Sequence, residues 1–542
     1  MSVKVPDKKI VVILPAYHAV KTLQRTVEAI PREWVDEVIL VDDASSDDTA
    51  VLARSLGITT IVHQTNTGYG GNQKTCYREA LARGGDVIVM VHPDFQYHPK
   101  FIPDLIREIV EGGGDVAFGS RMMVRGKALE GGMPRWKYIA NIFLTKVENF
   151  VLGLCLTEYH SGFRAYSRKV LESIPLEANA NGFSFDSEII VQLRLLGYSI
   201  KEIPITTSYF KGASMIGFWK SVQYGFSILK LLSDYLFFFW GVRSDPRFLV
   251  RRHACPICKD PHPFLYYRAR GSISGLTTYT ITENSVGIHD DIFFCRNCKS
   301  AFQISSSPTE DIAAAYAAQL CDPIYLQEAK GRRRSFQRIV ERLERLIRGR
   351  KILDVGAGPG LFLLEAKSRG WEVAGVEPSS AAREYAKETF GIELLGGGVD
   401  ELARLPDGSF DVVSAIDVIE HLPNPAILLD QVRRLVAPGG VAVLTTPRFD
   451  SALSRLMGDR WYAILPSHLT YFSKRGLFQL IRDSGLAVQT ARHFTRYFSP
   501  AYLWFRLAPY LGMPAVPRAG SRFVPVQLFD EFELYLKKRN EA

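Results

Sequence analysis

The chain has 542 residues, too many for one ordinary hydrophobic core, so its length predicts two or three domains. Apolar residues make up 47% of the sequence and charged residues 23%, a balance typical of folded globular protein that excludes a disordered chain. The formal net charge of +9 fits anionic lipid or phosphorylated small substrates. No run of Lys and Arg interleaved with aromatic residues indicates a nucleic-acid surface, so we expect no nucleic-acid partner.

Two stretches of the chain share one pattern. Residues 8–210 and 351–490 each alternate short β-branched runs with helical patterns, which is typical of a parallel sheet with helices on its faces. Between them lie an aromatic, helix-like segment at 216–240 and two CxxC pairs within 253–300. The two alternating halves share no motif, so the sequence predicts an α/β chain without internal repeats.

Polar residues follow the predicted strands of the first half, at the edge where parallel strands end. Asp42 and Asp43 close the run EVILVDD, and their carboxylates can accept hydrogen bonds from base N–H groups or ribose hydroxyls. In NTGYGGNQK the glycines permit close backbone approach, and Lys74 can meet a phosphate. The run VIVMVHPDFQ then puts further polar residues just past a buried strand. This order favours glycosyl transfer from a nucleotide diphosphate with a divalent cation.

The motifs of residues 8–240 follow the order of a known family. They are PAY (15–17), VDDASSDDT (41–49), PDFQYHP (93–99), FGSR (118–121), SGFRAYSRKVL (161–171) and GFSFDSEII (182–190). On these motifs the segment resembles a family 2 glycosyltransferase of the GT-A fold, in the branch that contains polyprenyl-phosphate sugar transferases. The resemblance implies a Rossmann-like domain that binds a nucleotide sugar and acts on a glycan or lipid-phosphate acceptor.

The same resemblance implies roles for single residues. The implied nucleotide-sugar contacts are Pro15, Tyr17, Asp42, Asp43, Lys74, Asp94, Arg121 and Arg164. The implied catalytic residues are Asp94 and Asp186, and the implied ligands of Mn²⁺ or Mg²⁺ are Asp94 and Gln96, with His92 as a third candidate.

Two positions depart from the family pattern. His92 replaces the first aspartate of the D-x-D metal motif, which favours Mn²⁺ or weak metal dependence because Mn²⁺ tolerates imidazole better than Mg²⁺ does. A loop histidine bonded to backbone explains His92 equally well. The usual P-x-Y-N-E opening reads PAYHA and lacks its glutamate, so the preferred base is open. Asp42 and Asp43 could instead cap the following helix, and a phosphate acceptor, already an oxyanion, needs no base from Asp186.

The aromatic segment at 216–240 has three readings. It could be an amphipathic pair of helices at a membrane surface, part of the core, or an interdomain contact. Its most apolar part is interrupted by Lys230 and Asp234, which makes it too short and too polar for a membrane-spanning helix.

The cysteine pairs predict a structural metal site. CPIC at 255–258 and CRNC at 295–298 have the spacing for four thiolates on one tetrahedral Zn²⁺. The predicted ligands are Cys255, Cys258, Cys295 and Cys298. Two unrelated pairs of buried thiols are the alternative.

The second half opens with a strand, a glycine-rich turn and a helix, KILDVGAGPGLFLLEA. Glycines at 356, 358 and 360 let the backbone pass under a ligand, with Asp354 just before them. The next strand ends in Glu377, placed to accept hydrogen bonds from both ribose hydroxyls of a nucleoside.

Residues 253–490 resemble a class I methyltransferase that begins with a two-CxxC knuckle. The resemblance rests on the knuckle, the glycine turn, DVIEH at 417–421 and PSHLTYF at 466–472. It implies that S-adenosylmethionine is held by Asp354, Gly356, Gly358, Gly360, Glu377, Asp400, Glu401 and Asp417. The glycines with Asp354 would hold the methionine end, Glu377 the ribose, and Asp400 with Glu401 the adenine.

Methyl transfer to a hydroxyl benefits from a base, for which His421 and His468 are the candidates. A histidine that bonds to backbone behind the pocket is the alternative for each. The run D-x-x-E-H at 417–421 also resembles the E-x-x-E-H of ubiquinone-type O-methyltransferases, which implies a divalent ion there. Capping of a helix start explains Glu420 as well.

Together these features predict a bifunctional cytoplasmic enzyme, peripheral at a membrane surface, that glycosylates one acceptor and methylates a sugar or related group, most simply on oxygen. The predicted regions are a glycosyltransferase domain (1–215), interfacial or linker helices (216–250), a zinc-binding domain (251–325), a methyltransferase domain (326–500) and a C-terminal extension (501–542). The alternatives are one active half beside a degenerate binding module, or a zinc-knuckle interaction protein.

Overall fold

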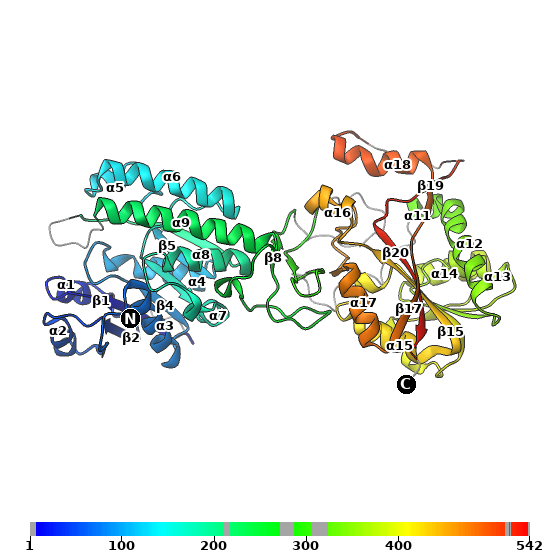
Figure 1. Ribbon diagram of the computed structural model, residues 1–542, viewed down its shortest axis with the longest axis horizontal. Coiled ribbons are helices and arrows are strands. Elements are labelled where there is room, and N and C mark those ends of the chain that lie inside the picture. The colour runs from blue at the N-terminus through cyan, green and yellow to red at the C-terminus, as the bar shows by residue number, and fades with distance from the viewer. Residues whose placement is uncertain are drawn as a thin grey trace. The chain divides into compact units, whose positions relative to one another are not determined.

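Figure 1 shows a computed structural model of the chain, which describes residues 7–209, 217–271, 287–304, 323–514, 520 and 522–539. The chain divides into two compact units, Met1–Arg252 and His253–Ala542. Both are α/β, so the predicted fold class is confirmed. The two units are described separately below.

The first unit is built on a seven-stranded sheet with the order β3-β2-β1-β4-β6-β5-β7. The strands are β1 (Ile10–Ala16), β2 (Glu37–Asp42), β3 (Thr59–Val62), β4 (Val87–Met90), β5 (Val116–Ser120), β6 (Arg164–Ser167) and β7 (Ile200–Pro204). Strands β2 and β4 pair in parallel with the two sides of β1, so the carboxyl ends of these three strands meet at one edge. Strand β6 runs antiparallel to its neighbours β4 and β5.

Helices cover both faces of this sheet. They are α1 (Leu23–Glu28), α2 (Thr49–Ser55), α3 (Tyr69–Ala82), α4 (Ile102–Val110), α5 (Lys127–Glu130), α6 (Arg135–Leu152), α7 (Arg168–Ser173), α8 (Phe185–Leu196) and α9 (Phe218–Phe239). Every residue of β1 is buried, as its unbroken apolar run IVVILPA predicts for a central parallel strand.

The aromatic segment forms one long helix, α9, that packs beside α6 (Figure 1). Ile228, Leu231 and Tyr235 are buried on one side of α9, whereas Trp219 and Phe226 on the helix are 76% and 68% exposed. The segment therefore combines core packing with an open aromatic face. Among the described helices, none is both long enough and apolar enough to cross a membrane.

The second unit contains a small antiparallel sheet with the order β16-β10-β9-β8. Its strands are β8 (Phe264–Tyr267), β9 (Ile292–Phe294), β10 (Ala301–Gln303) and β16 (Thr470–Tyr471). Because β10 pairs with β16, the cysteine-bearing segment shares a sheet with residues far along the chain. Cys255, Cys295 and Cys298 also share one hydrophobic core with Phe472.

The larger sheet of the second unit has the order β13-β12-β11-β14-β15-β20-β17. Its strands are β11 (Lys351–Val355), β12 (Glu372–Glu377), β13 (Leu395–Gly396), β14 (Phe410–Ile416), β15 (Val436–Pro447), β17 (Leu486–His493) and β20 (Glu531–Lys538). Strand β20 lies between β15 and β17 and is antiparallel to both. Residues 501–542, expected to form an extension, thus supply an inner strand, because Phe532, Leu534 and Leu536 alternate along it and are buried.

Helices and a short ribbon complete the second unit. The helices are α11 (Pro323–Gln327), α12 (Ala329–Leu346), α13 (Leu361–Lys367), α14 (Ser380–Phe390), α15 (Pro425–Leu435), α16 (Ala452–Met457), α17 (Lys474–Asp483) and α18 (Pro500–Leu507). The ribbon pairs β18 (Arg496–Phe498) with β19 (Val524–Val526). The predicted division of the chain into five regions stays a prediction.

Candidate functional sites

In the first unit, Asp43 fixes the loop that follows β3. Its carboxylate bonds to the ring Nδ1 of His63 at 2.8 Å and accepts hydrogen bonds from the backbone N–H groups of Thr67 at 2.8 Å and Gly68 at 3.0 Å. Burial alone would raise the pKa of Asp43, but the hydrogen bonds from these three residues outweigh it and hold the pKa below its usual value. The sequence singled out Asp43 but not His63 or Thr67, which only the folded loop brings to it.

Asp42 and Asp43 do not cap the following helix. Asp42 accepts hydrogen bonds from the backbone N–H and the hydroxyl of Ser45, at 3.0 and 2.5 Å. Helix α2 begins at Thr49, whose backbone N–H donates to Asp47. Nearby, Pro15 lies in β1 and Tyr17, just beyond it, is 57% exposed. The predicted nucleoside-binding residues therefore gather where β1 and β2 end.

A hydrogen-bonded chain crosses the site from β4 to α8. The ring Nε2 of His92 lies 3.1 Å from the hydroxyl oxygen of Tyr69, which donates to the Asp186 carboxylate at 2.7 Å. Burial and the Asp186 charge raise the pKa of Tyr69 well above its usual value, so this phenol stays protonated. The alternative in which His92 bonds to backbone is thus replaced by a bond to a tyrosine that the sequence did not single out.

Asp94 and Gln96 share a tight turn after β4. The Asp94 carboxylate accepts a hydrogen bond from the Gln96 backbone N–H at 2.9 Å, and Phe95 between them has a φ of 53°. Within the described residues, groups of three or more close His, Cys, Asp or Glu ligand atoms occur twice, both in the second unit. His92 and Asp94 are thus not gathered with a third ligand of these types.

The two predicted basic contacts, Arg121 and Arg164, are buried braces. Arg121 is 4% exposed and forms an ion pair with Glu158, which is also buried. Arg164 is 1% exposed and donates to the backbone oxygens of Ser161 at 2.7 Å and Asp186 at 2.9 Å. Both guanidinium groups hold loops at the sheet edge, and their contact with a nucleotide sugar stays a prediction.

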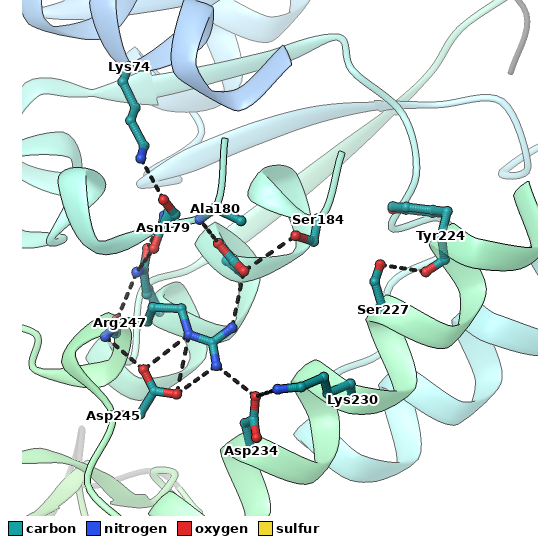
Figure 2. Close-up of polar contacts among 12 residues, drawn as sticks. Lys74, Asn179, Ala180, Ser184, Tyr224, Ser227, Lys230, Asp234, Asp245 and Arg247 are labelled. Carbon is teal, nitrogen blue, oxygen red and sulfur yellow. Dashed lines mark hydrogen bonds and ion pairs between the residues drawn. The ribbon is translucent and has the colours of Figure 1, made fainter. Parts of the chain in front are cut away.

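Lys74 is likewise bound within the protein. Its ammonium donates to the backbone oxygen of Asn179 at 2.5 Å and to the side-chain oxygen of Asn181 at 2.8 Å (Figure 2 shows the first). The same loop is also held by Glu188, which accepts from the backbone N–H of Ala180 at 2.7 Å and pairs with Arg247 at 3.1 Å. The Lys74 ammonium is therefore bonded to this loop, and its contact with a phosphate stays a prediction.

The loop held by Lys74 closes over the start of α3. The backbone N–H of Gly70 donates to the Asn181 oxygen at 2.7 Å, and a Cβ at Gly70 would lie 2.4 Å from the Ala180 oxygen. The close approach that the glycines permit is thus used by the protein backbone. Beside it opens a hollow of about 530 Å³, lined by Thr67, Gly71, Lys74, Thr75, Arg78, Glu177, Asn179 and Asn181.

In the second unit, the four predicted cysteines converge. Sulfur atoms lie 3.6 Å apart for Cys255 and Cys298 and 3.5 Å apart for Cys258 and Cys295. The two loops repeat one hydrogen-bond pattern. The backbone N–H of Lys259 donates to the backbone oxygen of Cys255, and that of Lys299 donates to the backbone oxygen of Cys295. Both lysines have positive φ, 59° and 62°. Four thiols at these separations fit one tetrahedral Zn²⁺.

The glycine turn and the second strand of this unit meet. Gly356, Gly358 and Gly360 all have positive φ, at 70°, 52° and 81°. The Glu377 carboxylate accepts hydrogen bonds from the backbone N–H groups of Gly358 and Ser379, both at 2.8 Å. Burial raises the pKa of Glu377 above its usual value. The glycine turn, predicted to hold the methionine end of S-adenosylmethionine, and Glu377, predicted to hold its ribose, therefore lie next to each other.

Asp354 lies under this turn. It accepts a hydrogen bond from Ser414 at 2.7 Å, and burial together with the neighbouring Glu377 charge raises its pKa to about 7. The predicted adenine-side residues are farther out: Asp400 is exposed, and Glu401 pairs with Arg404 at 2.9 Å.

Asp417 is held beyond β14 in a left-handed conformation with a φ of 55°. It accepts a hydrogen bond from the Thr445 hydroxyl at 2.8 Å and pairs with Arg496 at 2.6 Å. Burial would raise the pKa of Asp417, but the Arg496 charge outweighs it and lowers the pKa. Arg496 also pairs with Glu531 at 2.7 Å. Neither Arg496 nor Glu531 was singled out from the sequence.

The two predicted base histidines lie together. The ring centroids of His421 and His468 are 4.6 Å apart, and each Nδ1 bonds to a backbone oxygen, that of Ser467 at 2.9 Å and that of Ala463 at 2.8 Å. Burial lowers the pKa of both rings, that of His468 to about 3. Beside them burial and the Asp417 charge raise the pKa of Glu420. Both histidines thus form the hydrogen bonds to backbone oxygens that the alternative interpretation expects.

Comparisons with known proteins match both units. The family model described as glycosyl transferase family 2 matches residues 11–174, and a methyltransferase domain model matches residues 329–491. An uncharacterized protein of Methanocaldococcus jannaschii is 30% identical over 42% of this chain and 93% of its own length.

Two further relatives have named activities. The UDP-N-acetylglucosamine–dolichyl-phosphate N-acetylglucosaminyltransferase of Methanococcus voltae is 27% identical over 41% of this chain and 94% of its own length. The polyprenol monophosphomannose synthase of Mycolicibacterium smegmatis is 30% identical over 37% of this chain and 78% of its own length.

Proposed function

Because the chain belongs to glycosyl transferase family 2 and also carries a methyltransferase domain, we propose that it is a bifunctional enzyme. The first unit transfers a sugar from a nucleotide-sugar donor to a polyprenyl-phosphate-type acceptor. The second unit transfers a methyl group from S-adenosylmethionine to a hydroxyl of a sugar or related acceptor. One observation carries the proposal: carboxylates at the carboxyl ends of parallel strands in two separate sheets are held by backbone turns, at Asp43 in one unit and Glu377 in the other.

The donor site of the first unit lies where β1, β2 and β4 end. Asp42 and Asp43 hold the nucleoside, and Asp94 with Gln96 would hold Mn²⁺ or Mg²⁺, with His92 as a third candidate. These carboxylate, amide and imidazole groups fit a cation that neutralises a diphosphate. In this proposal the basic side chains support the site, because they hold its loops in place. They are Arg121, Arg164 and Lys74.

A phosphate acceptor needs orientation more than it needs a base. Its oxygen is already anionic near neutral pH, so an attack on the sugar carbon gains little from proton removal. Asp186 accepts a hydrogen bond from Tyr69 and lies 3.9 Å from the Arg164 guanidinium. We assign Asp186 to positioning Tyr69 and the loop before α8, at the edge where the acceptor approaches.

The α6–α9 face supports a lipid-linked acceptor. Its exposed large apolar residues are Trp136, Ile139, Phe143, Phe150, Phe218, Trp219, Phe226, Leu229 and Phe237. The exposed charges of the two helices are Arg135, Lys146, Lys220 and Lys230, all cationic. An aromatic face with cations suits the surface of an anionic bilayer, and both named relatives act on polyprenyl-type phosphates. This face would keep the chain peripheral at the membrane.

S-adenosylmethionine is assigned to the second unit. The glycine turn with Asp354 would hold its methionine end and Glu377 its ribose, with Asp400 and Glu401 toward the adenine and Asp417 on the methyl-transfer face. The cofactor supplies a methyl group on a cationic sulfur, and the chain supplies orientation around it. The four cysteines would hold a structural Zn²⁺ that ties their loops to the methyltransferase core.

Turnover tests the first activity. UDP-N-acetylglucosamine and a panel of other nucleotide sugars should be consumed in the presence of Mn²⁺ and a polyprenyl phosphate. Asp94→Ala should abolish this turnover, whereas Asp104→Ala, an exposed aspartate of α4 paired with Arg107, should leave it unchanged. Absence of turnover with every donor, together with no binding of any nucleotide diphosphate, would support the alternative in which the first unit is a degenerate binding module.

Vesicle sedimentation tests the membrane assignment. The full chain should sediment with vesicles that contain phosphatidylglycerol and less with neutral vesicles, because the exposed charges of the α6–α9 face are cationic. The double variant Trp219→Ser and Phe226→Ser should sediment at least about tenfold less. A matched exposed change outside the face, Leu456→Ser in α16, is the control, and equal loss in both would contradict the assignment.

A further inference from the structure

Three side chains of the second unit that can each bind a metal ion lie close together, although a catalytic base would need only one of them. Glu420, His421 and His468 each offer one ligand atom, and these atoms lie within 4.8 Å of one another. Glu420 is 1% exposed and His468 is 8% exposed. The cluster is therefore enclosed, beyond the end of β14 where the methyl-transfer face is proposed.

Two separate segments are locked together at this cluster. The backbone N–H of Leu469 donates to the Glu420 backbone oxygen at 2.8 Å, which joins the segment after β14 to the segment before β16. The Thr446 hydroxyl donates to Oε2 of Glu420 at 3.0 Å and fixes the carboxylate. The three groups are thus preorganised, which is what a ligand set needs.

Both histidines have a defined tautomer. The Nδ1 atoms of His421 and His468 lie 2.9 and 2.8 Å from the backbone oxygens of Ser467 and Ala463. A carbonyl oxygen can only accept a hydrogen bond, so in each ring Nδ1 carries the proton and Nε2 carries the lone pair. A histidine that ligates a metal through one nitrogen commonly donates its other N–H to such an oxygen.

The third group contributes a buried acceptor without a donor. Oε1 of Glu420 is buried and has no hydrogen-bond partner in the described structure, although Oε2 is bonded to Thr446. An unpaired carboxylate oxygen in such a place is costly. A cation is the group that such an oxygen beside two imidazole lone pairs would bind.

We propose that Glu420, His421 and His468 bind one divalent transition-metal ion. Two imidazole nitrogens and one carboxylate oxygen favour ions such as Zn²⁺, Co²⁺ or Fe²⁺ over Mg²⁺, which prefers oxygen. Three protein ligands leave the ion an open position, unlike four closed thiolates. This set also differs from the D-x-x-E-H run, because the Asp417 carboxylate is bonded to Thr445 and paired with Arg496.

The site deepens the proposed methyl transfer, on which this consequence rests. A hydroxyl acceptor bound to the open position would lose its proton to solvent water more readily than in solution. The oxygen lone pair would then form the O–CH₃ bond as the S–CH₃ bond breaks, and the bonding pair would stay on sulfur in S-adenosylhomocysteine. The ion would thereby replace either histidine as the activating group.

Co²⁺ titration of the full chain tests the site. With Zn²⁺ retained on the four cysteines, the chain should bind one further Co²⁺, with weak visible bands and without the intense near-ultraviolet absorption of cobalt–thiolate bonds. Glu420→Gln and His468→Asn should each weaken this binding more than about tenfold. His493→Asn, which changes a histidine of the same unit outside the cluster, should leave it unchanged.

A second measurement needs no variant. Pulsed electron paramagnetic resonance of the wild-type chain loaded with Cu²⁺ should show two equivalent imidazole nitrogens. No Co²⁺ beyond the thiolate site, or unchanged binding in both cluster variants, overturns the assignment. S-adenosylhomocysteine binding is measured on the same samples. Failure of the wild-type chain to bind S-adenosylhomocysteine would contradict the proposed methyl transfer. Failure of the wild-type chain to bind the further Co²⁺, with S-adenosylhomocysteine still bound, would contradict only the metal site.

Discussion

Carboxylates at the sheet edges of the two units are buried in the same way but stabilised in opposite ways. Asp43 in the first unit accepts hydrogen bonds from its own loop, which hold its pKa below the usual value. Asp354 in the second unit accepts one from Ser414 and lies near Glu377, and its pKa rises to about 7. The two buried carboxyl groups therefore differ in the direction of their pKa shift. The charged form is favoured at Asp43, and the protonated form is favoured at Asp354.

This difference indicates what each site is built to meet. Donors from His63 and the Thr67–Gly68 backbone leave Asp43 charged and oriented before any ligand arrives, which suits recognition of neutral N–H and hydroxyl groups. Burial raises the pKa of both Asp354 and Glu377, and the Glu377 charge raises that of Asp354 further, which suits a ligand with positive charge. S-adenosylmethionine carries an ammonium and a sulfonium, whereas a nucleotide sugar is an anion. The electrostatics of the two units thus match two different donors.

The largest effect is expected at the four cysteines, because folding of the second unit would depend on the proposed Zn²⁺. Cys298→Ser removes one of four ligands from a buried cluster and should destabilise the second unit by about 5 kcal/mol or more. Scanning calorimetry should show its transition lost or strongly lowered while that of the first unit persists, and metal analysis should find zinc absent. Cys155→Ser, an exposed thiol of the first unit, is the control. Unchanged zinc in Cys298→Ser would contradict the prediction.

The first unit depends instead on a buried ion pair. Glu158→Gln leaves the Arg121 guanidinium buried without its counter-ion, which should lower the free energy of unfolding of this unit by about 3–5 kcal/mol. Denaturant titration measures the change. Glu130→Gln breaks the exposed pair with Lys127 and should cost less than about 1 kcal/mol. Equal effects of the two variants would show that Arg121 is not the brace described.

A smaller effect is expected on the affinity for the cofactor product. Glu377→Gln keeps the shape of the side chain but replaces a carboxylate oxygen by a donor facing the Gly358 or Ser379 N–H, so S-adenosylhomocysteine should bind about 1–3 kcal/mol more weakly. Calorimetric titration checks this. Glu372→Gln, at the exposed start of the same strand, should bind the ligand as the wild type does. Parallel loss of nucleotide-sugar binding would indicate a general defect.

The smallest effect follows from the raised pKa of Asp354. If its carboxylate meets the ligand's ammonium, protonation below about pH 7 should weaken S-adenosylhomocysteine binding by about tenfold per pH unit. Asp354→Asn should bind weakly at all pH values and flatten the profile. In the ligand-free chain the sign is opposite: because the folded-state pKa is raised, this carboxyl costs stability as the pH rises from about 4 through 7. A flat wild-type binding profile would argue against this contact.

Local sequence patterns predicted the architecture because they depend on neighbours. Unbroken apolar runs indicated buried parallel strands, the glycine turn indicated a ligand-binding bend, and the paired CxxC spacing predicted the cysteine cluster that the structure shows. Family membership and transferase activity are confirmed by the comparisons. The roles of single site residues stay predictions.

Contacts between distant segments could not be predicted from one sequence. Arg496 meets Asp417 across 79 residues, and Tyr69 meets Asp186 across 117, and no spacing rule connects such pairs. The same limit applies to Lys74 and Arg164, whose bonds to backbone oxygens no motif predicts. A basic residue in a motif looks alike whether it faces a phosphate or a backbone oxygen, and only the fold separates the two.

The central claim is that one chain carries two independent donor sites, and paired calorimetric titrations of the wild type and two variants test it most directly. The account predicts one nucleotide-diphosphate site and one S-adenosylhomocysteine site per chain. Asp94→Ala should impair only the first in the presence of Mn²⁺, and Glu377→Gln only the second. Binding of both ligands lost together in either variant, or either ligand failing to bind the wild type, would contradict it.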